Sequence, residues 1–367
     1  MQSIKLPLWL KLACILIILI AVAFILIMGQ KVIVPLLFSF LFAILLLPVA
    51  NFFENKTKLS RSIASIIAVL LFLIVVSLII YLLDSQINSL STEWPLLKAQ
   101  LVTLLDNLQT WMATTFHVNL EKQTEYINNA SNNLVESSGS IVEKTVLSLS
   151  SMIFFIVFIL IYTILLLFYR RILMRFIVAA FTEKYINLIY EIIEHIKHIV
   201  RKYITGLVFE MAIVAAIACV IFWILGIKYI FLLGLLVGVF NVIPYIGIFT
   251  ALLLSVSITF ATADGKHALF VAIAIICIHL FDSNLLMPKV VGAQVKINPL
   301  MVILGVIIGE MLFGISGMFL SIPYLAIAKI IFDRVEGLQP WGILLGEEEH
   351  PPKKVKRIFQ KIKKKKE

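Results

Sequence analysis

The chain has 367 residues, of which 61% are hydrophobic and only 14% are charged. Soluble domains are about 45–50% apolar and about 25% charged, so this composition excludes a soluble globular protein and indicates a polytopic membrane protein. The formal net charge is +10, and nine of the 31 lysines and arginines lie between Lys353 and Lys366. We expect this basic tail, 336–367, to bind anionic lipid headgroups on the cytoplasmic side rather than nucleic acid.

A membrane-spanning helix needs about 20 apolar residues. Apolar runs predict four spans in the first half of the chain, at 9–28, 32–50, 62–83 and 149–169. Residues 1–83 thus form an N-terminal part with three helices. The segment 149–205 holds the fourth span and an amphipathic helix over 183–203, which we expect to lie along the inner membrane interface.

The polar segment 84–148 separates the third and fourth spans. It holds three basic residues against seven acidic ones, whereas lysine and arginine crowd the segments that flank the other spans. This charge bias predicts that 84–148 is extracytoplasmic and that both termini of this multi-pass protein are cytoplasmic. An apolar stripe with 3–4 spacing over 87–111 predicts a helix in this insert, which either mediates self-association or covers the membrane domain.

The C-terminal half, 206–335, begins with a fifth span at 206–226 and contains two apolar regions that are too long for one span. The region 229–262 would be about 50 Å long as one helix, against a bilayer core of about 30 Å. It is interrupted by the motif NVIPYIG, and the second long region, 299–333, is interrupted by GEMLFGISG. We expect two half-helices in each region, on either side of a span at 267–287. Eight spans, ten spans, or six spans with two re-entrant hairpins all satisfy this pattern.

Polar and helix-breaking residues gather at these interruptions and in the link 278–299 between them. Charged groups inside a membrane are costly and usually functional. Pro244 and Pro288 each free a backbone carbonyl one turn earlier, which is tolerated only beside protein or a water-filled cavity. Discontinuous helices of this kind form substrate and ion sites in secondary transporters. The candidate substrate or ion pathway comprises Asn241, Pro244, Tyr245, Gly247, Asp282, Asn284, Pro288 and Glu310.

Several of these polar residues also have a structural explanation. Asp282 either takes part in transport or forms a structural hydrogen bond, for example with His279 one turn earlier. Glu310 lies either in the pathway or at an exposed hairpin tip, and Glu210, four residues into its span, is expected at the membrane interface. The sequence Asn298-Pro299 predicts a helix start, because asparagine is a good N-cap and proline suits the first position. The glycines Gly309 and Gly314 mark the last helix break.

The sequence contains no enzyme or cofactor motif. It lacks a GxxxxGK[ST] phosphate-binding loop, an HExxH zinc motif and a GxSxG nucleophile motif. Glu191, His195 and His198 have a spacing that a metal site can use, but a solvated polar helix face explains them better. We therefore expect no enzymatic activity, no cofactor and no bound metal.

Three motifs together resemble a known family. NVIPYIG at 241–247, DSNLLMPKVVGAQVKINP at 282–299 and GEMLFGISGMFLSIP at 309–323 are similar to successive signatures of the autoinducer-2 exporter (AI-2E) family of bacterial transporters. The resemblance covers about residues 10–335. It implies an all-α, eight-spanning, oligomeric membrane protein with an extramembrane insert, which exports a small polar solute.

Some members of that family are linked instead to sodium–proton exchange, and this chain departs from the family pattern at two acidic positions. The family commonly has a glycine at the position of Glu310 and often a glutamate at the position of Asp282. The additional acid at Glu310 favours cation coupling.

Three hypotheses about function follow. The first is an exporter of a small, autoinducer-2-like polar solute through the broken helices. The second is a sodium (cation)–proton antiporter that uses Asp282 and Glu310, and the third is a non-transporting oligomeric membrane scaffold. The expected partners are the lipid bilayer, a small polar solute or cation, and further copies of the chain in a homo-oligomer.

Overall fold

The computed structural model describes residues 7–81, 86, 152–243, 246–287, 289 and 296–347. Within these residues every regular element is a helix, and six helices are long and apolar enough to cross a membrane. The chain is therefore an all-α polytopic membrane protein, as its composition predicts. The helix predicted in the insert 84–148 and the basic tail beyond 347 lie outside the described residues, and Gln86 is the one described residue of the insert.

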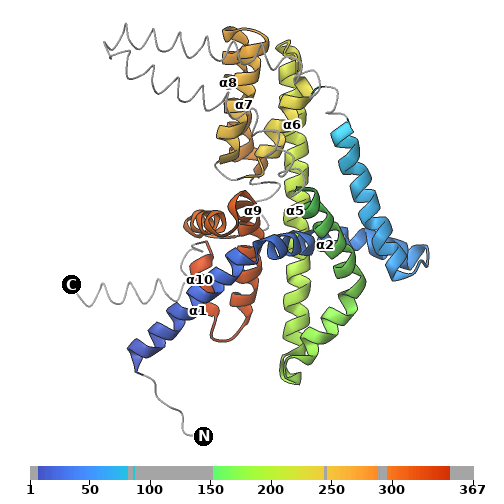
Figure 1. Cartoon of the computed structure of the whole chain (residues 1–367), viewed down its shortest axis with the longest axis vertical. Helices are drawn as coiled ribbons and strands as arrows, with labels where there is room; N and C mark the ends of the chain where they lie inside the picture. Colours follow the sequence, from blue (N-terminus) through green and yellow to red (C-terminus); the bar gives the residue numbers. More distant parts are fainter. Residues whose placement is uncertain are drawn as a thin grey trace, which may run out of the picture. The chain divides into compact units, whose positions relative to one another are not determined.

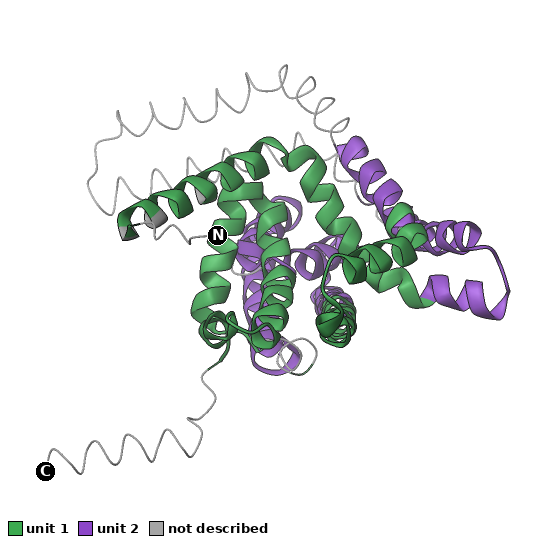
Figure 2. Ribbon diagram, turned by 90° about the horizontal axis from the view of Figure 1, so that it is seen from below, with its two compact units in different colours: residues 1–48, 165–207, 288–367 green, residues 49–164, 208–287 purple. Residues whose placement is uncertain are grey.

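The chain divides into two compact units (Figure 2). The first unit comprises residues 1–48, 165–207 and 288–367, and the second comprises 49–164 and 208–287. The C-terminal half that the sequence delimits, 206–335, is thus shared between the units, with the division at Met287.

The spans predicted in the first half are helical. They correspond to α1 (Leu8–Met28), α2 (Gln30–Lys56) and two further helices, Arg61–Tyr81 and Met152–Ala179. Pro48, which was expected near the end of the second span, lies inside α2 together with Pro35. The fourth helix continues well past its predicted end at 169.

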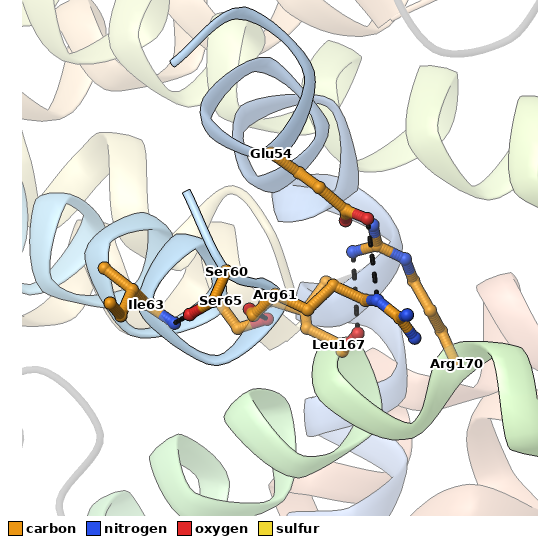
Figure 3. Close-up of polar contacts among 7 residues, drawn as sticks. All are labelled: Glu54, Ser60, Arg61, Ile63, Ser65, Leu167 and Arg170. Atoms are coloured by element: carbon orange, nitrogen blue, oxygen red, sulfur yellow. Dashed lines mark hydrogen bonds and ion pairs between the residues drawn. The ribbon is translucent and has the colours of Figure 1, made fainter. Parts of the chain in front are cut away.

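A short loop joins α2 to the helix Arg61–Tyr81, and polar groups fasten it on both sides (Figure 3). The Arg61 Nε atom lies 3.5 Å from Glu54 Oε1 at the end of α2. Ser60 Oγ accepts a hydrogen bond from the Ile63 N–H and so caps the new helix. Because Lys58 in this loop has a positive φ of 55°, the chain turns sharply here.

The prediction of a separate amphipathic helix and fifth span was wrong. Residues Ile186–Ile224 form a single helix of 39 residues, α5, which follows a 3₁₀ turn over Glu183–Tyr185. The only local signal for a break is Gly206, and an isolated glycine costs about 1 kcal/mol relative to alanine in a helix. That cost is too small to end a helix whose two halves are both packed.

The first long apolar region forms two half-helices, α6 (Ile230–Phe240) and α7 (Ile246–Thr262). Gly234 and Gly238 of α6 allow this helix to approach α5 closely, since a Cβ atom on Gly238 would lie 2.7 Å from the Met211 carbonyl oxygen. At the start of α6, Gln86 Oε1 accepts a hydrogen bond of 2.8 Å from the Leu232 N–H. Gln86 therefore caps α6, whose own N-cap residue, Tyr229, provides no side-chain bond.

The helix α8 (Gly265–Phe281) lies beside α7 (Figure 1) and continues into a π-helical turn, η2 (Asp282–Leu286). Asp264 is its N-cap and accepts a bond of 2.8 Å from the His267 N–H. This bond holds the pKa of the exposed Asp264 carboxyl below its ordinary value.

Helices α5, α6, α7 and α8 enclose the apolar core of the second unit. Its fully buried side chains include Val214, Phe222, Leu233 and Val271. The packing of these side chains holds α6, α7 and α8 together at the corner between α6 and α7.

The second long apolar region, α9 (Pro299–Arg334), breaks at Gly314, which has φ 60° and ψ −145°. The two arms of α9 pack together at Gly309 and Gly317, where a Cβ atom on either glycine would overlap the carbonyl oxygen of the other. In the same unit, Tyr324 Oη donates a bond of 2.9 Å to the Leu37 carbonyl of α2.

The ends of α9 are fastened by local bonds. Asn298 is the N-cap of α9, and its Oδ1 accepts a bond of 3.0 Å from the Leu300 N–H. The Asn298 N–H donates to the Leu345 carbonyl at the end of α10 (Gln339–Leu345), and Ile297 forms an isolated bridge with Gly346. The chain after α9 therefore folds back, so that the end of α10 contacts the residues that begin α9.

Substitution of Asn298 by alanine is expected to lower the free energy of unfolding by about 1 kcal/mol, because the Leu300 N–H loses its cap. Thermal unfolding of the purified protein in detergent measures the change. Asn298→Ser is the matched control, since serine is also a good N-cap and should unfold close to the parent. An alanine variant as stable as the serine variant would contradict the prediction.

Candidate transport site

The amide of Asn241 connects two acidic side chains from different helices of the second unit. Its Nδ2 atom donates a hydrogen bond of 2.9 Å to Asp282 Oδ2 and a longer one of 3.4 Å to Glu210 Oε1. Glu210 belongs to α5, Asn241 is the C-cap of α6, and Asp282 is the first residue of the π-turn η2. We call these three residues the carboxylate cluster.

Both carboxylates of the cluster are removed from solvent. Glu210 is 5% exposed and Asp282 is 3% exposed. The two groups lie close together, because both accept a hydrogen bond from the same Asn241 nitrogen. Within the described part of the chain no lysine, arginine or histidine forms an ion pair with either of them. Two adjacent carboxylates in a low-dielectric region disfavour double ionisation, so the cluster attracts a proton or another positive group.

Each carboxylate also has one oxygen that is buried without a hydrogen-bond partner among the described residues. These atoms are Glu210 Oε2 and Asp282 Oδ1. Buried polar atoms are rarely left unpaired in proteins, and the exceptions need a functional or solvent explanation. The two oxygens belong to neighbouring acidic groups, and as acceptors they can be paired only by a hydrogen-bond donor, a proton shared between the two groups, or a cation.

The local backbone explains why these side chains meet. Asn241 follows the last residue of α6, and the tight corner after it requires Gly247, because a Cβ atom there would overlap the Phe240 carbonyl oxygen. A π-turn holds one residue more than an α-turn and often occurs at functional positions in helices. Here it begins at Asp282 itself.

The chain matches the AI-2E family of transporters over residues 14–337. This range includes every helix that contributes to the carboxylate cluster. The chain belongs to the AI-2E transporter family.

Two relatives in the AI-2E family are similar in sequence to most of this chain, and a third is similar to about a third of it. The AI-2 transport protein TqsA of Escherichia coli (strain K12) is 25% identical over 332 residues, which cover 87% of this chain and 90% of TqsA. YueF of Bacillus subtilis (strain 168) is 25% identical over 320 residues, covering 81% of this chain and 82% of YueF. YrrI of the same organism is 36% identical over 129 residues, but this match covers only 35% of the chain and 36% of YrrI.

Of the pathway residues predicted for this AI-2E protein, the second unit brings together Asn241 and Asp282, with Gly247 at the adjacent corner. Asn284 lies apart, since its exposed side chain donates a bond of 2.7 Å to the Leu280 carbonyl of its own helix. Glu310 is an exposed residue of α9 in the other unit. Pro244, Tyr245 and Pro288 lie outside the described residues.

These contacts identify the partners of two acidic residues that the sequence singled out. The bond of Asp282 is to Asn241 and not to His279, whose Nδ1 atom is buried without a partner in the described chain. The Glu210 side chain is buried inside the unit beside Asn241, and its expected position at the membrane interface stays a prediction. The sequence signal for the burial of Glu210 was limited to its place as an acidic residue inside an apolar span.

Several polar groups outside the carboxylate cluster form ordinary pairs. Glu191, considered above as a metal ligand, accepts a bond of 3.2 Å from Arg334 Nε at the end of α9. Lys329 and Asp333 form an ion pair within α9. The described residues contain no group of three or more potential metal ligands.

Proposed function

We propose that this AI-2E protein is a secondary transporter of the inner membrane that exports a small polar solute through the carboxylate cluster. The observation that supports this most directly is a pair of buried carboxylate oxygens without a hydrogen-bond donor among the described residues, at the point where α6 breaks and α8 enters a π-turn. Transporters of other folds use such broken helices to bind substrates and ions near the middle of the membrane.

The chemistry of the cluster restricts the solute. Glu210 Oε2 and Asp282 Oδ1 are acceptors, so the site suits a ligand with hydroxyl or N–H donors and disfavours an anion. A small polyhydroxylated molecule of the autoinducer-2 type has such donors, and the name of TqsA supports this class of solute. Membership of the AI-2E family supports transport itself.

A second function, cation–proton antiport, is favoured by a specific observation. Glu210 and Asp282 both accept from the same Asn241 nitrogen and have no basic partner among the described residues, so the site suits a cation or a proton. In this version Asn241 orders the two carboxylates, and a sodium ion and a proton compete for them. Glu310 has no demonstrated connection to this cluster and is less well supported than Asp282.

Flux measurements in proteoliposomes test the proposal. Vesicles loaded with autoinducer-2 or with a small polyol should release it through the parent protein. Asp282→Asn is expected to reduce this efflux at least about tenfold, which corresponds to a loss of about 1.4 kcal/mol. Asn284→Ala is the matched control, because that exposed amide bonds only to its own helix and its loss should leave the efflux within twofold.

Three other results would change the interpretation. Efflux that survives Asp282→Asn would remove the carboxylate cluster from the pathway. A pH change inside the vesicles that follows an imposed sodium gradient, without solute efflux, would replace the first function by antiport. No flux of any solute or cation through folded protein would contradict transport and leave a membrane scaffold.

A further inference from the structure

The short helix α10 has an apolar side that no described part of the chain covers. Gly342 and Leu345 form its buried side. Trp341, Ile343 and Leu344 are instead exposed, and 80% of the Ile343 surface is accessible. Because large apolar side chains are costly to leave in water, a patch of three of them on two helical turns indicates an interaction surface.

The helix α10 is held beside the last turns of α9. A Cβ atom on Gly342 would lie 3.1 Å from the Asp333 backbone nitrogen, and one on Gly346 would lie 3.4 Å from Lys329 Cε. The contacts on α9 thus run from Asp333 back to Lys329 while α10 runs forward from Gly342 to Gly346. α10 therefore runs back along α9 in the opposite direction, and its apolar side faces sideways, away from α9.

Charged pairs at the end of α9 indicate where the membrane surface lies. The helix α9 is apolar and long enough to cross a membrane, but its last turns carry Lys329, Asp333 and Arg334. Lys329 pairs with Asp333, and Arg334 Nε lies 3.2 Å from Glu191 Oε1 of α5. Charged groups are costly in hydrocarbon, and near helix ends they extend to the membrane interface. Since α10 lies beside these residues, it lies at the membrane surface.

The chemistry around α10 suits the boundary between lipid and water. Tryptophan and tyrosine are enriched there, because their rings contact acyl chains while their polar atoms bond to headgroups or water. Tyr190, next to Glu191 of α5, is also exposed. In the sequence after α10, nine lysines and arginines between Lys353 and Lys366 outnumber three glutamates at 347–349. This excess of positive charge complements anionic headgroups.

We propose that Trp341, Ile343 and Leu344 insert into the adjacent leaflet of the membrane, so that α10 is an interfacial anchor for the last turns of α9. The three side chains lie where headgroups meet acyl chains, as the apolar faces of amphipathic interfacial helices do. The anchor does not depend on the carboxylate cluster. Its failure is therefore distinct from failure of the proposed transport function, which the Asp282→Asn efflux measurement tests.

Tryptophan fluorescence of the full-length protein tests the anchor. Trp341 becomes the only tryptophan when Trp9, Trp94, Trp111 and Trp223 are replaced by phenylalanine. The protein is reconstituted into vesicles of phosphatidylcholine and phosphatidylglycerol. Phosphatidylcholine brominated in the upper part of its acyl chains should lower the Trp341 emission at least about twofold, whereas acrylamide in the water should have little effect.

The matched control has its only tryptophan at position 336, through Glu336→Trp combined with Trp341→Phe. Glu336 is exposed in the turn between α9 and α10 and does not belong to the apolar side. Acrylamide should quench this control strongly and brominated lipid should quench it weakly. Equal quenching of the two positions by brominated lipid overturns the anchor, because the quenching would then not follow the apolar side of α10.

Two further results would also overturn the anchor. Quenching of Trp341 by acrylamide but not by brominated lipid places the apolar side in water. Quenching by neither reagent places it against protein, such as a second copy of the chain. If thermal unfolding shows that the phenylalanine replacements prevent folding, the same two quenchers are applied to a bimane label on Ile343→Cys, in protein whose Cys14, Cys219 and Cys277 are alanine.

Discussion

Replacing Asn241 by alanine is expected to reduce transport at least about 100-fold and to lower the free energy of unfolding by about 3 kcal/mol. The amide donates to two buried carboxylates, and hydrogen bonds to charged groups contribute about 1.5–3 kcal/mol each. The expected loss of stability lies at the lower end of the sum for two such bonds, because the bond to Glu210 is long, at 3.4 Å. Solute or proton flux in proteoliposomes and thermal unfolding in detergent measure the two effects.

Exchanging the amide of Asn241 with the carboxyl of Asp282 shows whether the loss of flux is due to the chemistry of these two groups. Asn241→Asp alone keeps the shape of the side chain but removes the only amide from a site with two acids, so it should be at least as damaging as alanine. Adding Asp282→Asn returns one amide and two carboxylates to the cluster, and flux should partly recover. A double variant no better than Asn241→Asp would show that the position of the amide, and not its donor atoms, is what matters.

Gly247→Ala is expected to lower the free energy of unfolding by about 3 kcal/mol, at the upper end of the usual range for overpacking. The added methyl group would overlap the Phe240 carbonyl oxygen, and this atom belongs to the backbone that ends α6. The strain cannot be relieved by a side-chain rotation, so the corner that positions Asn241 must open. Thermal unfolding and the yield of folded protein measure the effect.

Gly265→Ala is the matched control for this substitution. Its Cβ atom would lie 3.5 Å from the Phe260 ring, an ordinary van der Waals distance. The two substitutions add the same methyl group to the same helix pair, so they share any general effect of replacing glycine. Equal stability of the two variants would mean that the α6–α7 corner is less tightly closed than its geometry indicates.

The helix breaks were predictable because their signals are local. Proline and glycine act through the backbone of a few adjacent residues, so NVIPYIG and the run around Gly314 indicated interruptions in two overlong apolar regions. The continuity of α5 was not predictable in the same way. A change from an amphipathic to a fully apolar pattern suggests two elements, although nothing in the backbone requires an interruption between them.

The partners in the carboxylate cluster are a long-range property. Asn241 lies 31 residues from Glu210 and 41 from Asp282 along the chain. The sequence marked Asn241 and Asp282 because polar residues inside apolar regions are unusual, but it could not show which of them meet. The partner of Glu210 was not predictable for the same reason, since an acidic residue in an apolar span does not indicate which helix it faces.

The cap on α6 has a mechanical consequence. One end of this 11-residue helix is held by Gln86, at the beginning of the insert, and the other end carries Asn241 between two carboxylates. A helix of that length is a stiff rod of about 16 Å. The helix α6 thus joins Gln86 to the carboxylate cluster, and we expect a shift of the Gln86 contact along the helix axis to displace Asn241.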